Sequence, residues 1–294
     1  METMGLNRNL IGKEYASQDY TVTAEATAAY ARAYNEDNAW FFGTDPSEYI
    51  IAPPMFGVVA GWLSNMLVVT DSELNVDVLR LLHSRQDMRF FRPIIPGDTI
   101  TSTATIGAIE DQRGGESLTL EIHSRNQHGK AVQQLTFTAF IRGQGRRQRG
   151  AASTHETPKE EPLLRVSQRI DPDQTFRYAE ASGDRNPIHV DENVAKMAGL
   201  PGIVVHGLCT MACASKVIID SVCENDPRRL KRLTAQFARP VFPGQTITTA
   251  LWPGEGDGRY VYETVNPDRR AVIKPGSAEV AAVATVATAA NTEH

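Results

Sequence analysis

The chain has 294 residues, of which 30 are basic and 35 acidic, so its formal net charge is −5. Hydrophobic residues make up 41 % and charged residues 22 %, which is typical of a globular protein and excludes disordered, collagen-like and coiled-coil classes. Because the chain is not basic overall, nucleic acid is not expected as its main partner. The length favours two domains, since single cores stop growing near about 250 to 300 residues.

The cysteines and the N-terminus exclude further classes. Cys209, Cys213 and Cys223 lack the C-x-x-C spacing of a zinc or redox site. Residues 1–18 contain no apolar segment of the kind a secretory signal needs. The longest apolar stretch, residues 55–69, is interrupted by Gly and polar residues and is shorter than the roughly 20 residues of a membrane span. We therefore expect a cytoplasmic protein with no membrane partner.

The first half of the chain reads as helices followed by strands. Apolar spacing predicts helices over residues 24–35 and 54–69, and alternation predicts strands over residues 99–109, 117–124 and 132–141.

The second half repeats this order. Asp171 followed by Pro172 predicts a capped helix that runs to Gly183, and Asp191 caps a second helix over 192–198. A long apolar helix is expected over residues 207–222, followed by strands over residues 245–252, 259–265 and 278–286.

A sequence repeat indicates that the chain is one module written twice. The segment Arg92-Pro-Ile-Ile-Pro-Gly-Asp-Thr-Ile100 recurs half a chain length later as Arg239-Pro-Val-Phe-Pro-Gly-Gln-Thr-Ile247. Tyr30-Ala31 and Tyr178-Ala179 match in the same order. Duplication explains both matches better than chance.

The fold class that follows is α+β. Each half is expected to wrap an antiparallel sheet around its long helix, and two such sheets side by side would share an edge. We expect a pseudo-dimer with domains at residues 1–150 and 151–294, joined within the Gly-, Pro- and charge-rich segment 142–162.

Candidate catalytic residues gather on one short segment of the second half. Asp184 follows the glycine that ends a helix, and His189 follows Pro187, so a carboxylate and an imidazole are held near each other. Such a pair can take a proton from water and return one to carbon. Gly207 opens the long helix, where its amide has no intrahelical acceptor and can bind an oxygen on which negative charge develops.

These residues carry a family resemblance. The string Ser182-Gly-Asp-x-Asn186-Pro-Ile-His-x-Asp191, with the later His206-Gly207, resembles the signature of the MaoC-like family, the (R)-specific enoyl-CoA hydratases and 3-hydroxyacyl-thioester dehydratases. The resemblance covers residues 163–287 and implies a double hotdog. It also implies that Asp184 and His189 hold the water while the Gly207 amide binds the thioester carbonyl.

The first half looks like a degenerate copy of this site. Alignment of Asn38 with Asn186 places Glu36, Phe41 and Phe56 opposite Asp184, His189 and His206. No acid/base pair remains there, so one active site per chain is expected. Trp40, Phe41 and Phe42 suit either an apolar wall for an acyl chain or plain core packing.

The same residues have alternative roles as metal ligands, loop supports or helix caps. Asp184, His189, Asp191 and His206 could ligate a metal, but their spacing fits no familiar ligand pattern, so neither a metal nor a cofactor is predicted. Asn186 is expected to support the loop by hydrogen bonds, and Asp191 to cap a helix.

We expect a hydratase that adds water reversibly to 2-enoyl thioesters. A hotdog thioesterase and a non-catalytic acyl-thioester-binding module remain alternatives. The sequence leaves open the acyl group, the carrier (coenzyme A or acyl carrier protein), assembly into a homodimer of double hotdogs, and which of Asp184 and His189 gives the final proton.

Overall fold

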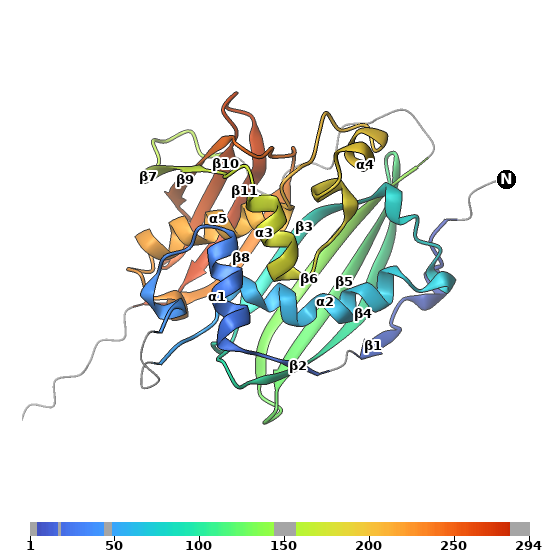
Figure 1. Ribbon diagram of the computed structural model, residues 1–294, viewed down its shortest axis with the longest axis horizontal. Helices are drawn as coiled ribbons and strands as arrows, with labels where there is room; N and C mark the ends of the chain where they lie inside the picture. The colour runs from blue at the N-terminus through green and yellow to red at the C-terminus, as the bar shows by residue number, and fades with distance from the viewer. Residues whose placement is uncertain (1–4, 17–18, 44–48, 144–156, 283–294) are drawn as a thin grey trace, which may run out of the picture.

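The computed structural model describes residues 5–16, 19–43, 49–143 and 157–282. These residues form an antiparallel sheet of eleven strands in the order β1-β4-β5-β6-β3-β8-β11-β10-β9-β7, with β2 paired to β4. Helix α2 crosses the strands of the first half and helix α5 those of the second (Figure 1). The arrangement confirms the predicted α+β class with one long helix for each half.

The first half places its main helix against its own strands. Its helices are α1 (Ala24–Ala33) and α2 (Gly57–Val69), with short 3-10 turns that include η2 (Ala39–Phe41) and η3 (Pro54–Phe56). Its strands are β1 (Glu14–Ala16), β2 (Tyr20–Thr21), β3 (Leu81–Phe90), β4 (Thr99–Gln112), β5 (Gly115–Asn126) and β6 (Ala131–Arg142).

The second half follows the same plan. Its helices are α3 (Gln174–Ser182), α4 (Glu192–Met197) and α5 (Gly207–Ser221), with the 3-10 turn η6 (Pro187–His189) between the first two. Its strands are β7 (Leu164–Arg169), β8 (Leu230–Phe237), β9 (Thr246–Pro253), β10 (Arg259–Val265) and β11 (Ala271–Val280).

The two halves join where β3 pairs with β8. The pairing is antiparallel and places Asp87 opposite Thr234. The Asp87 carboxylate also accepts two hydrogen bonds from the Arg232 guanidinium, at 2.6 and 2.9 Å. Each sheet therefore covers the edge that the other would expose, as the pseudo-dimer prediction requires.

Local conformations confirm the repeat in detail. Asn35 after α1 and Gly183 after α3 are both left-handed, with φ of 61° and 80°. Three residues after each, Asn38 and Asn186 accept a hydrogen bond from the backbone N–H two residues ahead, which starts a 3-10 turn. The same chain path therefore precedes the main helix in both halves.

Helices α1 and α3 lie side by side at the centre of the molecule (Figure 1). The buried hydroxyls of Tyr30 and Tyr178, which the repeat pairs, lie 3.0 Å apart. A hydrogen bond between equivalent residues indicates that they meet at the pseudo-two-fold axis.

Several sequence predictions need correction. Strands β3 and β8 were missed because they carry charged residues, which pair across the junction and break the apolar alternation. Asp171 does not cap α3; its carboxylate accepts hydrogen bonds from Arg177 and Asn35 instead. The last strand begins at Ala271 and not at residue 278, and residues 283–286 of that prediction lie outside the described chain. The boundary at 150/151 also lies outside it and stays a prediction.

An ion-pair cluster stabilises the segment of the first half that the repeat pairs with the segment around Asp184. The Glu36 side chain is fully buried, and its Oε1 accepts hydrogen bonds from the backbone of Asp37 and Asn38. Lys216 Nζ, from α5 of the other half, lies 3.1 Å from the same oxygen and also pairs with Asp37 and Asp220.

Removal of the Lys216 charge should destabilise the fold. In Lys216→Met the buried Glu36 carboxylate loses its cation, so we expect the free energy of unfolding in urea to fall by about 3 kcal/mol. The double variant with Glu36→Gln should recover most of this loss. Lys196→Met, which removes an exposed ion pair with Glu192, is the control and should change stability by less than about 0.5 kcal/mol. Equal effects of the two lysine variants would contradict the assignment.

Candidate active site

The end of α3 and the turn η6 hold Asp184 and His189 on one bend. Gly183 ends α3 in a left-handed conformation, which a side chain rarely adopts, and turns the chain toward the main helix. The Asp184 carboxylate then accepts a hydrogen bond from the Asn186 N–H, and the Asn186 side chain accepts one from Ile188. The bend is therefore held by its own polar groups.

Hydrogen bonds orient the two imidazoles of the site. His189 Nδ1 donates to the Val204 carbonyl at 2.7 Å, so in the neutral ring Nε2 keeps a lone pair. His206 Nε2 donates to the Asp184 carbonyl at 2.9 Å, and its Nδ1 lies 3.3 Å from the Thr175 hydroxyl. His206 therefore has both nitrogens engaged and braces the bend, while His189 has one nitrogen available.

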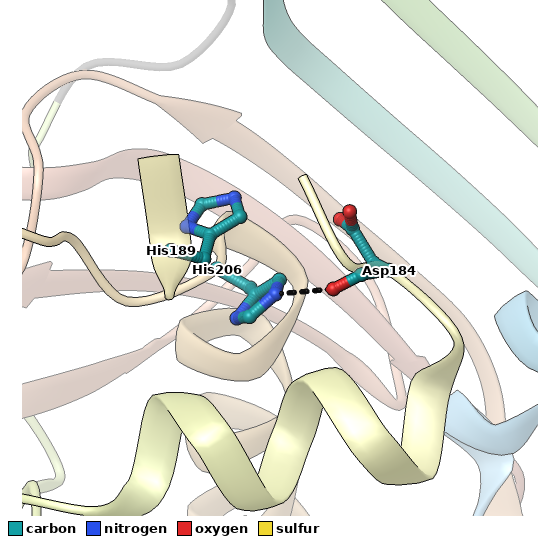
Figure 2. A group of neighbouring side chains, drawn as sticks. All are labelled: Asp184, His189 and His206. Atoms are coloured by element: carbon teal, nitrogen blue, oxygen red, sulfur yellow. Dashed lines mark hydrogen bonds between the residues drawn. The ribbon is translucent and has the colours of Figure 1, made fainter. Parts of the chain in front are cut away.

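The structure brings Asp184 and His189 together, as the sequence predicts. Figure 2 shows the Asp184 carboxylate and the His189 ring on the same side of His206. One atom from each of these three side chains lies within 4.8 Å of the others, and the two rings stack at 3.8 Å. A water molecule can bridge a carboxylate and an imidazole at this separation, since each of its hydrogen bonds spans about 2.8 Å.

Burial raises the pKa of Asp184, the lower of the pair, and lowers the pKa of His189, the higher of the pair. Desolvation raises the pKa of Asp184, although the nearby His189 and the Asn186 N–H act against it. Desolvation also lowers the pKa of His189, against the influence of Asp184. Burial, with the charge of His189, lowers the pKa of His206 to about 3. Burial thus shifts each of the three groups toward its neutral form, relative to the same group in water.

Gly207 differs from its counterpart in the first half. It begins α5 directly after an extended His206, so its N–H lies at the helix start without an intrahelical acceptor. The N–H of Gly57 instead bonds within the 3-10 turn η3. Gln133 also contacts Gly57 and donates to its carbonyl at 2.6 Å. Only the second half therefore offers a glycine amide at the mouth of its main helix.

Three aromatic residues near the site were missed by the sequence analysis. A Cβ on Gly207 would lie 3.2 Å from the Phe237 ring, which packs on His83 of β3. A Cβ on Gly183 would lie 3.6 Å from Trp62 of α2. Phe237 stands two residues before the repeated Arg-Pro turn, so the repeat was the signal that could have located it. His83 and Trp62 come from the first half, and no pattern marked them.

The apolar run Trp40 to Phe42 packs mainly on the first half, with one contact from the second. Phe41 is buried against Ala31 and Ile51, and the Arg228 guanidinium lies 4.2 Å from the Trp40 ring centre. Core packing, one of the two roles expected for this run, accounts for these contacts.

The three clustered side chains offer few ligands for a metal. Both nitrogens of His206 and Nδ1 of His189 are engaged by oxygen partners, which leaves the Asp184 carboxylate and one nitrogen of His189. The Asp191 carboxylate caps α4 by accepting hydrogen bonds from Asn193 and Val194. Stable zinc sites use three or four protein ligands, so these residues do not fit a metal.

Comparison with known proteins identifies the family. A model of the MaoC-like domain matches residues 153–268, and a model of the FAS1-like dehydratase region matches residues 9–135. The chain is 30 % identical over 256 residues to a probable enoyl-CoA hydratase 2 of Dictyostelium discoideum, covering 83 % of this chain and 86 % of that protein. The chain belongs to the MaoC-like dehydratases.

Other members support the assignment. A 3-hydroxyacyl-thioester dehydratase of Mycobacterium tuberculosis is 31 % identical, over 69 % of this chain and 73 % of that one. The MaoC-like dehydratase structure from Phytophthora capsici has a TM-score of 0.79 at 26 % identity and covers 94 % of this chain and 98 % of that one. A Mycobacterium tuberculosis protein described as a double hotdog has a TM-score of 0.57 at 14 % identity, over 92 % and 96 % of the two chains. The double hotdog prediction is therefore confirmed.

Within the part of the chain that the structure describes, no helix has the length and apolar character to cross a membrane.

The buried histidines should make the fold sensitive to acid. Burial lowers the pKa of His206 to about 3 and of His83 to about 4, whereas an unfolded histidine titrates near 6.5. Between about pH 4 and 6.5 the unfolded chain binds more protons at these two sites, so stability rises with pH by up to about 1.4 kcal/mol per pH unit for each. The raised pKa of Asp184 opposes this slope, but it is one group against three, because burial also lowers the pKa of His189.

His83→Gln should therefore reduce the slope of unfolding free energy against pH by about 1.4 kcal/mol per unit, measured by urea denaturation from pH 4.5 to 6.5. His128→Gln, at an exposed turn position, is the matched control. An equal reduction in both variants would count against the prediction.

Proposed function

We propose that this MaoC-like chain hydrates 2-enoyl thioesters reversibly to 3-hydroxyacyl thioesters, with Asp184 and His189 as its acid/base pair. The observation that carries the proposal is the placement of the Asp184 carboxylate and the His189 imidazole with one ligand atom of each within 4.8 Å, on a bend braced by His206. The relatives named enoyl-CoA hydratase 2 and 3-hydroxyacyl-thioester dehydratase support the reaction type.

The hydrogen bonds and proton affinities support a separate role for each member of the pair. His189 Nε2, whose lone pair is left free by the Nδ1 bond to Val204, takes a proton from water as the water oxygen bonds to the β-carbon. The carbon–carbon π electrons move to the α-carbon and the thioester carbonyl. Asp184, whose pKa is raised by burial, is the group that we propose gives a proton to the α-carbon. Return of the proton from His189 to Asp184 resets the pair, and dehydration runs through the same steps in reverse.

The Gly207 amide supplies the third element of the reaction. Negative charge develops on the thioester oxygen while the β-carbon is attacked, and an N–H at a helix start stabilises such charge. Gly207 is half-buried, so the backbone can be approached by a ligand. In the first half the equivalent amide is engaged in a 3-10 turn, and Phe41 replaces the catalytic histidine. We therefore propose one active site for each chain.

The remaining features of the function stay predictions. Coenzyme A is the proposed carrier because the first relatives are named as enoyl-CoA enzymes, and acyl carrier protein is the alternative. A cytoplasmic location is predicted from the sequence, whereas the Arabidopsis thaliana relative is named as peroxisomal. The domain division at 150/151 and a homodimer of double hotdogs are likewise proposals.

Substitution of either acid/base residue should abolish most turnover without unfolding the chain. Asp184→Asn and His189→Ala are each expected to lower kcat by at least about 10²-fold, because each removes one proton-transfer group. Loss of the enoyl-CoA conjugated absorbance measures hydration across acyl chains of differing length and charge. Release of free thiol would identify a thioesterase instead, binding without turnover would identify a non-catalytic module, and near-native turnover in both variants would reject the residue assignment.

Removal of the Gly207 amide tests the oxyanion role directly. Proline is tolerated at the first position of a helix, and the extended His206 suits the residue before a proline. Gly207→Ala adds the Cβ that meets Phe237 but keeps the N–H, so it is the matched control. We expect kcat of Gly207→Pro to fall about 10² to 10³-fold below that of Gly207→Ala. Equal kcat values in the two variants would exclude the amide as the donor.

A further inference from the structure

The two copies of the catalytic bend lie in different electrostatic surroundings. In the first half Glu36 holds the position of Asp184, and Lys216 of α5 lies 3.1 Å from its carboxylate. Lys216 stands nine residues after Gly207. Nine residues after Gly57, the equivalent position on α2 is Met66. The pseudo-two-fold relation therefore predicts that Met66 has the position relative to the Asp184 bend that Lys216 has relative to the Glu36 bend.

A direct contact supports this placement of α2. Gly183 and Asn35 are equivalent left-handed residues, each one position before the carboxylate. A Cβ on Gly183 would lie 3.6 Å from Trp62 Cδ1 and 3.8 Å from its Nε1. Trp62 precedes Met66 by about one helical turn, so both residues lie on the same side of α2.

Among the described residues, the charged partner that acts on the Asp184 carboxyl, His189, comes from its own half. Helix α2, Gly57–Val69, contains no ionisable side chain. The titratable groups near the carboxylate are His189, His206 and Tyr178. The neighbouring Arg185 pairs with Glu180 at 2.7 Å on the exposed side of the bend. None of these residues, all within the described chain, gives Asp184 the salt bridge that Glu36 has.

We propose that Trp62 and Met66 form an apolar wall against Asp184 and, by offering it no cation, leave its carboxyl free to exchange a proton with substrate. The inference rests on the proposed function, in which Asp184 is the proton donor. Trp62 and Met66 are positioning residues under this proposal, because they act on the proton affinity of Asp184 and not on the reacting atoms. Under this proposal, the first half influences proton transfer in the second half because its helix α2 brings no charged side chain to Asp184.

A cation placed at residue 66 should act on the proton affinities of Asp184 and its partner His189. Met66→Lys would favour the ionised carboxylate and disfavour both protonation steps of the Asp184 and His189 pair. The pH profile of kcat/KM should then move to lower pH by about 0.5 to 1 unit, with a lower kcat at neutral pH. Met66→Leu, which keeps the apolar wall, should leave the profile in place. A uniform loss of activity with no shift would overturn the proposal.

A double-mutant cycle tests the same contact without any activity. Met66→Lys is combined with Asp184→Asn, and the unfolding equilibrium is measured in urea at pH 7. We expect the effect of Met66→Lys on stability to be more favourable when Asp184 is present than when it is replaced by Asn. The difference should amount to about fivefold or more in the unfolding equilibrium constant. Zero coupling would overturn the proposal. If the chain hydrates no enoyl thioester, the proposed function fails, and this cycle still decides whether residue 66 faces Asp184.

Tryptophan emission gives a second measurement in case the lysine variant does not fold. The chain has three tryptophans, so the difference between the wild type and Trp62→Phe isolates the signal of Trp62. This signal should titrate with the carboxyl and lose that titration in Asp184→Asn. If the Trp62 emission titrates identically in the wild type and in Asp184→Asn, the proposed contact between Trp62 and Asp184 is wrong.

Discussion

The pairing of β3 with β8 is the constraint on which the rest of the structure depends. It fixes the two halves about one axis, with Asp87 and Arg232 paired across the junction and Tyr30 meeting Tyr178 near the centre. Because the halves cannot rotate, each main helix lies against the other half's bend. The proposed active site is therefore a property of the whole chain, although its polar residues all come from the second half.

The same frame supports two different uses of one bend. In the first half, a buried carboxylate is held by Lys216, and the 3-10 turn before α2 engages the glycine amide. In the second, none of the described residues forms such an ion pair with Asp184, and Gly207 begins its helix without a preceding turn. Charge compensation makes the first bend a structural joint, whereas the proposed function uses the second bend for proton transfer. Under that proposal, stability and reactivity belong to separate copies of one motif.

The sequence was sufficient for the fold class and for the proximity of Asp184 and His189, because these depend on local patterns. The Arg-Pro turns, the left-handed residue after each helix and the spacing of Asp184 and His189 are all short-range signals. Strands β3 and β8 could not be found this way, since their charged residues are satisfied only across the junction. Trp62 and His83 were missed for the same reason, because contacts between halves leave no periodicity in either one.

The difference between the two bends follows from their place on one polypeptide. In a symmetric dimer of identical subunits, every codon change appears at both sites at once, so a residue that strengthens one copy also alters the other. Within a single polypeptide the two copies are encoded separately. Gln133 and Lys216 therefore each act on one side of the axis alone, and each copy of the bend can have its own partners.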